Sequence, residues 1–276
     1  MLKIKNAMTV DLEDWFCAYN ISHVIKRADW DKCELRVYEN TMRILAMLEQ
    51  YKVRATFFVL GWIAERVPEL IREIDRREHE IAVHGYDHVL LTQTTPSEFE
   101  EDLNKTLALL QRIGVRQQII GFRAPSFTLV KKTTWALDIL EQYQFKYDSS
   151  VFPVGFHPDY GMPDAPMDPY RITPGLIEFP ISCVDVFGKR LPCGGGGYFR
   201  IFPYAYSKQC IKRCNAEGRS AVFYIHPWEL DPDQPRLKLP WIKKFRHYYG
   251  LNSTERKLNR LLQDFQFTTI RDVLSL

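Results

Sequence analysis

Two histidines, His84 and His88, lie four residues apart in the segment His84-Gly-Tyr-Asp-His88. Side chains at positions i and i+4 of a helical turn share one face, so imidazoles at this spacing can bind the same metal ion. Taken alone, the spacing is more often a surface or packed histidine pair. A carboxylate as third ligand would favour the metal interpretation, because two histidines and one carboxylate leave positions open for water and substrate.

Three acids, Asp11, Glu13 and Asp14, follow directly after an apolar stretch near the start of the chain. As an isolated trio they would most simply cap a turn or face solvent. In the functional interpretation, one carboxylate binds the metal and another is the general base that accepts a proton from water. A cation beside such a base lowers its pKa and keeps it ionised at neutral pH.

The elements that position these residues follow from the apolar pattern. Strands are expected over residues 4–10, 55–60, 80–83, 119–122 and 221–225, and helices over 39–51, 64–74, 97–113 and 133–143. Strands that alternate with helices predict βαβ units and a parallel sheet. The acids, the histidines, Arg123 and His226 each follow one of these strands. Because βα loops meet at one end of such a sheet, we expect a single site there.

Composition sets broad limits. The chain has 276 residues, 46% of them hydrophobic, and a net charge of +3, values ordinary for a soluble globular protein. The sequence contains no apolar run of signal-peptide length and none of the ~20 residues that a membrane span needs. A cytoplasmic location with six free thiols is therefore the expectation. The segment Gly194–Gly197 does not open a helix as a phosphate-binding loop would, so nucleotide binding is not predicted.

Five segments resemble the motifs of the polysaccharide deacetylases of the NodB-homology type, carbohydrate esterase family four. They are Thr9-Val-Asp11-Leu-Glu13-Asp14, His84-Gly-Tyr-Asp-His88, Arg123-Ala-Pro125, Tyr147-Asp148-Ser-Ser and Ile225-His226. The family's usual first three motifs are Thr-Phe-Asp-Asp, His-(Ser/Thr)-x-x-His and Arg-x-Pro-aromatic. The ending His226-Pro-Trp-Glu-Leu-Asp231 resembles the exosortase-associated and capsule-cluster branch. This resemblance covers nearly the whole chain and implies an α/β fold, an irregular (β/α)7 barrel.

Three positions depart from the family pattern. The second aspartate of the usual pair is displaced, so that either Asp14 or Glu13 is available as the metal carboxylate. Asp14 is preferred because aspartate is the family's ligand type, although Glu13 is closer in sequence to the usual position. Gly85 replaces the hydroxyl residue after the first histidine. Ser126 occupies the aromatic position after Arg-x-Pro, with Phe127 one step later, so the wall of the sugar groove differs.

The resemblance also implies roles for individual residues. Asp11 corresponds to the general base, and Arg123 would hold it ionised and oriented. His226 corresponds to the general acid that protonates the leaving amine, with Asp148 as the residue that orients it. The residues expected to line the substrate groove are Ser126, Phe127, Tyr86 and Trp228. The expected cofactor is a divalent metal on Asp14 or Glu13, His84 and His88, most simply zinc, with cobalt, nickel or manganese as alternatives.

The implied activity is removal of N-acetyl groups from a sugar or polysaccharide precursor in the biosynthesis of exopolysaccharide or another cell-surface glycan. The partner would be an N-acetylated oligosaccharide or a lipid-linked glycan. Three alternatives use the same residues: an allantoinase-like ureide or formamide hydrolase, an O-deacetylase, and a non-catalytic glycan-binding relative. Retention of the acids, both histidines and His226 argues against the last of these.

A single domain over residues 1–276 is expected, with a basic C-terminal extension at about 236–276. Between Arg236 and Arg260 the sequence has eight lysines or arginines against one acid, Glu255. Most such runs are solvated helix faces. The alternative is peripheral contact with anionic lipid at the inner membrane. Nucleic acid is not an expected partner, because no recognition motif accompanies the charge.

Overall fold

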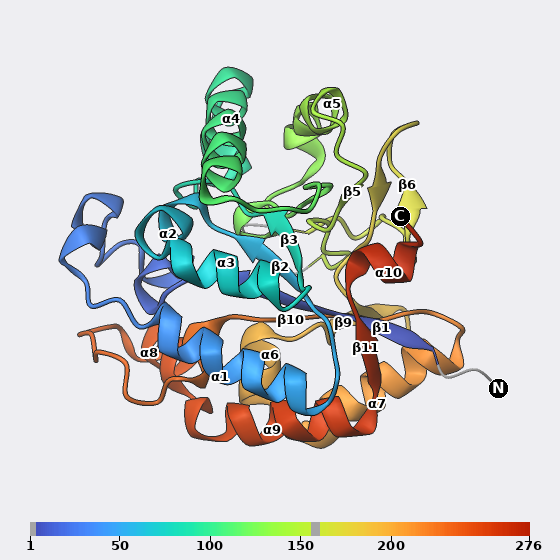
Figure 1. Cartoon of the computed structure of the whole chain (residues 1–276). Coiled ribbons are helices and arrows are strands. Elements are labelled where there is room, and N and C mark those ends of the chain that lie inside the picture. Colours follow the sequence, from blue (N-terminus) through green and yellow to red (C-terminus); the bar gives the residue numbers. More distant parts are fainter. Residues whose placement is uncertain (1–3, 156–160) are drawn as a thin grey trace.

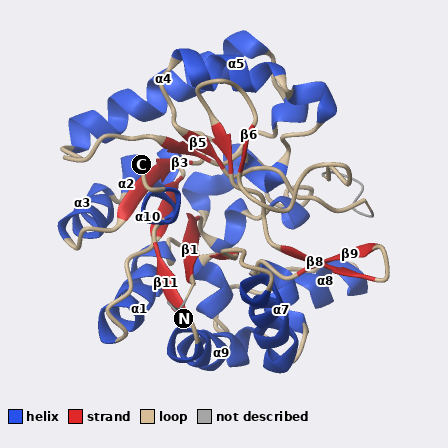
Figure 2. Ribbon diagram, turned by 90° about the vertical axis from the view of Figure 1, so that its right-hand side faces the viewer, coloured by secondary structure: helices blue, strands red, loops and turns tan. Residues whose placement is uncertain are grey.

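The computed structural model describes residues 4–155 and 161–276. Within them a curled sheet forms the centre and helices surround it, which confirms the expected α/β fold (Figures 1 and 2). The strands are β1 Lys5–Leu12, β2 Thr56–Val59, β3 Glu80–Val83, β4 Gly121–Phe122, β5 Tyr147–Asp148, β6 Tyr170–Arg171, β7 Ile177–Glu178, β8 Cys183–Val186, β9 Lys189–Pro192, β10 Val222–Ile225 and β11 Gln266–Thr268. The helices are α1 Val37–Gln50, α2 Gly61–Arg66, α3 Pro68–Arg76, α4 Pro96–Ile113, α5 Trp135–Gln142, α6 Gly196–Ile201, α7 Tyr204–Ala216, α8 Trp241–Tyr248, α9 Leu251–Asp264 and α10 Ile270–Leu274.

The sheet has the strand order β10-β1-β2-β3-β4-β5-β7-β6. Neighbours from β10 to β7 pair in parallel, and β6 pairs antiparallel with β7 at the edge. No pairing joins β6 to β10 among the strands of the described residues, so the sheet is a curled half-barrel there. A separate hairpin, β8–β9, extends from the body of the protein in Figure 2.

The central strand β1 explains why so many polar side chains converge. Every residue of β1 after Lys5 is buried, and β1 pairs with β2 and β10 along its length. Parallel strands buried on both faces must be mostly apolar, as the run Ala7, Met8 and Val10 shows. Asn6 and Thr9 are the buried polar residues of β1 before Asp11, and the three acids lie at the carboxyl end of the strand.

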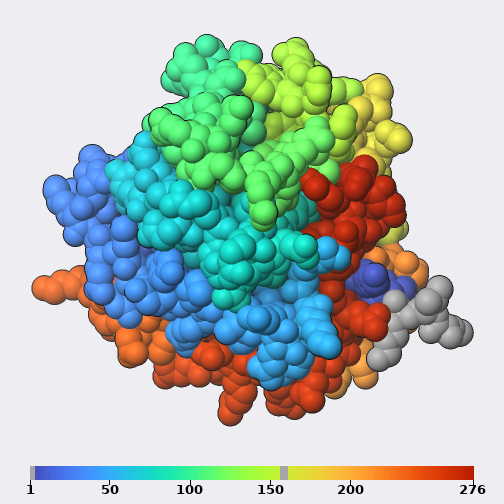
Figure 3. Space-filling model, in the orientation of Figure 1, coloured from blue at the N-terminus to red at the C-terminus, as the bar shows by residue number. Residues whose placement is uncertain are grey.

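The segment expected as a basic C-terminal extension is built into the sheet. Strand β11 pairs in parallel with the first residues of β1, and α9 buries Leu258, Leu261 and Leu262. Figure 3 shows the red C-terminal residues next to the dark blue residues of β1. None of the helices in the described residues is long and apolar enough to cross a membrane.

Candidate active site

Glu13, His84 and His88 bring three possible ligand atoms together at the carboxyl ends of β1 and β3. The Glu13 Oε1 lies 3.2 Å from His84 Nε2 and 3.0 Å from His88 Nε2, and all three side chains are buried. They are the only group of three or more metal-ligating side chains found within 4.8 Å of one another in the described residues. Burial opposes the charge on Glu13, but the charges of His88 and His226 hold its pKa well below the ordinary value.

The two histidines meet through a loop and not through the helical turn that their spacing suggested. Residues 84–88 have no helical assignment, and both Gly85 and His88 have positive φ, +74° and +56°. A side chain on Gly85 would be strained at that φ, and its Cβ would lie 3.2 Å from Asp102 Oδ1. The glycine after the first histidine therefore permits the tight turn that returns His88 to His84.

Asp14, the preferred metal ligand from sequence, points elsewhere. Its carboxylate accepts hydrogen bonds from the backbone N–H groups of Trp15 at 2.8 Å, Arg36 at 2.7 Å and Val37 at 2.9 Å. Asp14 thus ties the end of β1 to the start of α1, a capping role of the kind weighed against a functional one for the trio. Burial raises the pKa of Asp14 to about 6. The geometry corrects the preference and leaves Glu13 as the carboxylate beside the histidines.

Asp11 and Arg123 form a buried ion pair beside these three residues. Arg123 donates to Asp11 Oδ1 at 2.6 Å, and its guanidinium also donates to Thr9 Oγ1 and to both the carbonyl and the hydroxyl of Ser149. A planar guanidinium with several fixed acceptors has one orientation, so it also fixes the carboxylate that it contacts. The other oxygen of Asp11 lies 3.8 Å from His226 Nε2.

His226 is paired with Glu229, a residue that the sequence reasoning missed. The His226 Nδ1 lies 3.0 Å from Glu229 Oε2, which also accepts from the backbone N–H of His226. Although burial disfavours the charged ring, Glu229 and then Glu13 and Asp11 raise the pKa of His226 to about 9. A glutamate three residues after a helix start is a capping signal, and His226-Pro-Trp-Glu229 carries it in the sequence.

Asp148, expected to orient His226, forms no ion pair or hydrogen bond with it among the described contacts. It lies across from Glu178 in the β5–β7 register, and both carboxyl groups are fully buried. Burial, and after it the charge of Asp148, raises the pKa of Glu178 well above its ordinary value, and burial raises the pKa of Asp148 as well. Ser150 also donates to Asp148, at 2.5 Å.

A cavity of about 490 Å³ opens above these residues. Its lining contains eight of the expected site residues: Asp11, Glu13, His84, His88, Ser126, Phe127, His226 and Trp228. Ser126 and Phe127 have φ of +52° and +55°, a backbone conformation that side-chain-bearing residues rarely adopt. Strain of this kind is frequent in residues that line functional sites.

Tyr86 does not belong to that cavity. Its hydroxyl donates to Glu65 at 2.6 Å, and the ammonium of Lys105 lies 3.2 Å from the centre of its ring. It lines a different hollow beside Asp102 on the outer side of the histidine loop. The expectation that Tyr86 contacts substrate stays a prediction, and the ring lies outside the cavity that contains the other expected residues.

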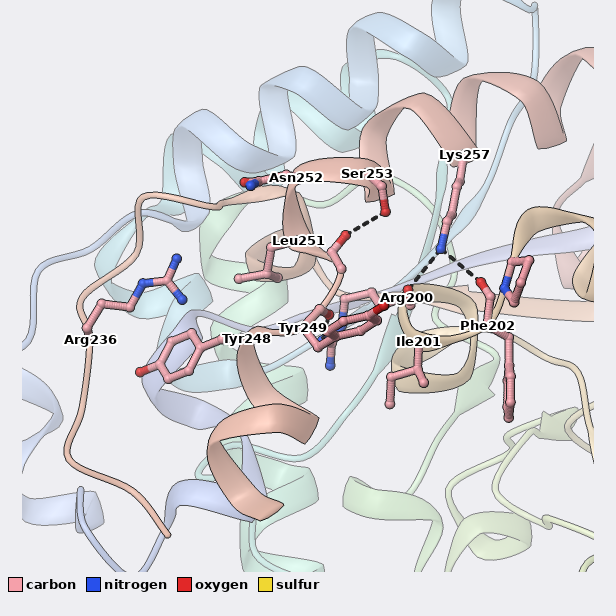
Figure 4. A pocket seen from close by; sticks show the side chains of 12 residues that line it. Arg200, Ile201, Phe202, Arg236, Tyr248, Tyr249, Leu251, Asn252, Ser253 and Lys257 are labelled. Carbon is pink, nitrogen blue, oxygen red and sulfur yellow. Dashed lines mark hydrogen bonds between the residues drawn. The ribbon is translucent and has the colours of Figure 1, made fainter. Parts of the chain in front are cut away.

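A second cavity, of about 390 Å³, is lined by residues that include Arg200, Tyr249 and Lys257 (Figure 4). Arg200, on α6, donates to Glu229 Oε1 at 2.6 Å and to backbone carbonyls at the end of α8, including Arg246 at 2.7 Å and Tyr249 at 2.8 Å. Lys257 donates to three carbonyls at the end of α6. These contacts make α6, α8 and α9 one support for Glu229 and hence for His226.

Comparison with known proteins finds families and relatives that match this chain. Residues 30–148 match the polysaccharide deacetylase model, and residues 149–275 match the domain of unknown function DUF3473. The chain is similar to the peptidoglycan-N-acetylglucosamine deacetylase of Bacillus cereus, with 37% identity over 76 residues, which is 28% of each chain. The matched segments span 28%, 32% and 30% of the length of the first three curated relatives.

Two solved structures share the fold. A peptidoglycan N-acetylglucosamine deacetylase superposes with a TM-score of 0.52 and 17% identity, covering 99% of this chain and 88% of the other. An allantoinase superposes with a TM-score of 0.63 and 15% identity, covering 99% and 89%. These two structures show that the fold is shared, and the family matches assign residues 30–148 to the polysaccharide deacetylase model and residues 149–275 to DUF3473.

Proposed function

We propose that this protein is a divalent-metal-dependent hydrolase that removes N-acetyl groups from a sugar of a polysaccharide or its precursor. The observation that carries the proposal is the meeting of three units in one cavity. They are the Glu13–His84–His88 group, the Asp11–Arg123 pair and the His226–Glu229 pair. The names of the similar proteins support the acetamide as the bond that is cleaved.

The residues present fit a metal ion of the size of zinc. His84 Nδ1 lies 2.8 Å from the carbonyl oxygen of Arg123 and must donate to it, which leaves the lone pair of Nε2 directed at the Glu13 carboxylate. Two acceptors facing each other require a cation between them or an added proton. Tetrahedral bonds of ~2 Å place neighbouring ligand atoms ~3.3 Å apart, close to the separations of 3.0 and 3.2 Å here.

When bound, the metal would polarise the acetyl carbonyl and make a water molecule more acidic. We propose zinc as the metal, with cobalt, nickel or manganese able to replace it. Glu13, His84 and His88 would hold it. Asp14 is excluded from the ligand set because its carboxylate is engaged by three backbone donors.

Asp11 would be the general base. Arg123 holds its Oδ1, so Oδ2 is the oxygen left to accept a proton from the water that attacks the acetyl carbon. A base held this way loses little orientational freedom when substrate binds.

His226 would be the general acid. Its pKa of about 9 keeps the ring protonated at neutral pH. The Nε2 proton passes to the sugar nitrogen as the C–N bond breaks, so that acetate and a free amine leave. Glu229, the largest contributor to the raised pKa, is not one of the proposed metal ligands.

The finer identity of the substrate is also a proposal. Ser126, Phe127 and Trp228 line the cavity and would contact the sugar ring. The His226-Pro-Trp-Glu-Leu-Asp231 ending supports a precursor of exopolysaccharide or another cell-surface glycan, in oligosaccharide or lipid-linked form. The open cavity suits a chain-like substrate better than a small ureide.

Metal content and acetate release, measured together, test the proposal. Purified protein is stripped with a chelator, reloaded with Zn²⁺, and assayed on N-acetylated chitooligosaccharides, an O-acetylated sugar and allantoin. We expect one metal per chain, acetate from the N-acetylated substrates, and loss of release after stripping. His226→Ala, which leaves the metal group intact, is the matched control and should bind metal without activity. Ureide hydrolysis without acetate release, or full activity without metal, would contradict the proposal.

A further inference from the structure

Helix α8, Trp241–Tyr248, presents its apolar side chains to solvent. Trp241 is 77% exposed, Ile242 49% and Phe245 42%, and Tyr249, directly after the helix, is 50% exposed. The Phe245 and Tyr249 rings stack with centroids 4.5 Å apart, so these two side chains form one surface. Exposed apolar residues are ordinarily scattered singly, and a contiguous group marks an interaction site.

The orientation of α8 is the reverse of that of an ordinary surface helix. At about 100° per residue, Trp241, Ile242 and Phe245 fall within one arc of about 100°, and His247 lies on the opposite side. His247 is the buried residue of the helix; it stacks on Trp228 with centroids 4.8 Å apart and contacts Gln234 at 3.0 Å. The helix is therefore anchored through an imidazole, and its apolar arc points away from the protein.

Positive charge flanks the apolar arc. The segment 234–250 contains five lysines or arginines and no aspartate or glutamate. Its cations are Arg236, Lys238, Lys243, Lys244 and Arg246, and none of them has a carboxylate partner among the ion pairs of the described residues. A cationic helix with a tryptophan and other large apolar residues on one face is the pattern of a helix that lies in a bilayer interface.

We propose that α8 docks this protein on the surface of an anionic lipid bilayer, with Trp241, Ile242, Phe245 and Tyr249 in the interface and the lysines against the headgroups. Charge alone would suit an anionic glycan as well, but such a polymer would leave the apolar arc in water. The exposed arc therefore favours the bilayer. The proposal goes beyond the deacetylase function and does not depend on it.

Docking through α8 would also place the active-site cavity at the membrane. Lys243 and Arg246, from the same helix, line the cavity that contains Asp11 and His226. Lys243 Nζ lies 3.2 Å from His23 Nδ1 at the rim. Figure 1 shows α8 close to the left-hand edge of the molecule, below the dark blue loop that follows β1. A substrate carried in the headgroup layer would then lie near the mouth of the cavity.

Vesicle flotation tests the proposal. The full chain is mixed with vesicles of phosphatidylcholine containing about 30% phosphatidylglycerol, or of phosphatidylcholine alone. We expect flotation with the anionic vesicles, weakened by 0.5 M salt because surface charges are screened. The double variant Trp241→Ala/Phe245→Ala should partition at least about tenfold more weakly. Neither residue lines the active-site cavity, so acetate release from a soluble substrate should be unchanged.

Two controls separate α8 from general stickiness. Phe187→Ala removes another fully exposed aromatic ring, in the β8–β9 turn, and should leave flotation unchanged. Trp241 is the one exposed tryptophan of the six, so brominated lipids should quench emission in the parent protein and not in Trp241→Phe. No flotation with anionic vesicles, equal flotation of the double variant, or binding to an anionic polysaccharide alone would overturn the proposal.

Discussion

Replacing each of the two adjacent acids, Glu13 and Asp14, in turn tests which of them binds the metal. Glu13 and Asp14 are neighbours in sequence, both are buried, and sequence alone favoured Asp14 as a metal ligand. In the structure, Glu13 faces two imidazoles, whereas Asp14 accepts three backbone hydrogen bonds. Glu13→Gln should therefore remove the metal and leave the fold, and Asp14→Ala should weaken the fold.

The magnitude for Asp14→Ala follows from its three donors. Each buried N–H left without an acceptor costs ~1–3 kcal/mol. Burial of the Asp14 carboxylate is itself unfavourable, because it raises the pKa of this group to about 6. This cost offsets part of the stability that the three hydrogen bonds contribute. A loss near the lower bound, about 3 kcal/mol, corresponds to a fall in Tm of about 5 °C for a chain of this size. Asp14→Asn keeps one acceptor oxygen, so its Tm should fall by about half as much.

The assay must separate stability from metal binding. Tm is measured on metal-free protein, because a bound metal stabilises the folded state, and affinity is measured by competition with a chromophoric chelator. Glu13→Gln should lose at least roughly 100-fold in metal affinity, more than outer partners of a ligand usually cost, with Tm within about 2 °C. An Asp14→Asn protein that loses the metal at unchanged Tm, beside a Glu13→Gln protein that retains it, would refute the assignment.

Three further predictions concern the catalytic groups. Asp11→Asn and His226→Ala should each lower kcat by about two or more orders of magnitude with circular dichroism unchanged; near-normal turnover in either would remove that role. Glu229→Gln should lower the pKa of His226 from about 9. Because His226 acts in its protonated form, the alkaline fall in kcat/KM should then move to lower pH. An unchanged pH profile would count against the pairing of His226 with Glu229. Tyr86→Phe should leave KM unchanged, since the ring lies outside the cavity, whereas Trp228→Ala should raise it; equal increases would place both rings against substrate.

The fold could be predicted because the spacing of apolar residues along the chain shows the periods of strands and helices. The strands near 4–10, 55–60, 80–83, 119–122 and 221–225 correspond to β1, β2, β3, β4 and β10. A short strand over residues 176–180 is also expected from its apolar residues and corresponds to β7, whereas β6, with two residues, has too few positions to show a period. The contact between Asp148 and Glu178 could not be predicted either, because it depends on the register in which β5 and β7 pair.

The choice between Glu13 and Asp14 was decided by a simpler rule that the motif comparison obscured. Side chains alternate across a strand, so residues two apart share a face. Asp11 ends β1 on the side of Arg123, and Glu13, two residues on, continues that side toward the histidines. Asp14 falls on the other side, toward α1. Alternation predicts the carboxylate that the family's residue type did not.

The proposed chemistry requires both regions of the chain. His84, His88 and Arg123 lie within the polysaccharide deacetylase match, but the acid His226 and its partner Glu229 lie in the DUF3473 region. Arg200, in the same region, joins Glu229 to three carbonyls at the end of α8. The Arg200 guanidinium thus holds both Glu229, which raises the pKa of His226, and the end of α8, the helix proposed to dock on the membrane. In the proposed mechanism, residues 149–275 would therefore supply the general acid and the contacts that hold it in place.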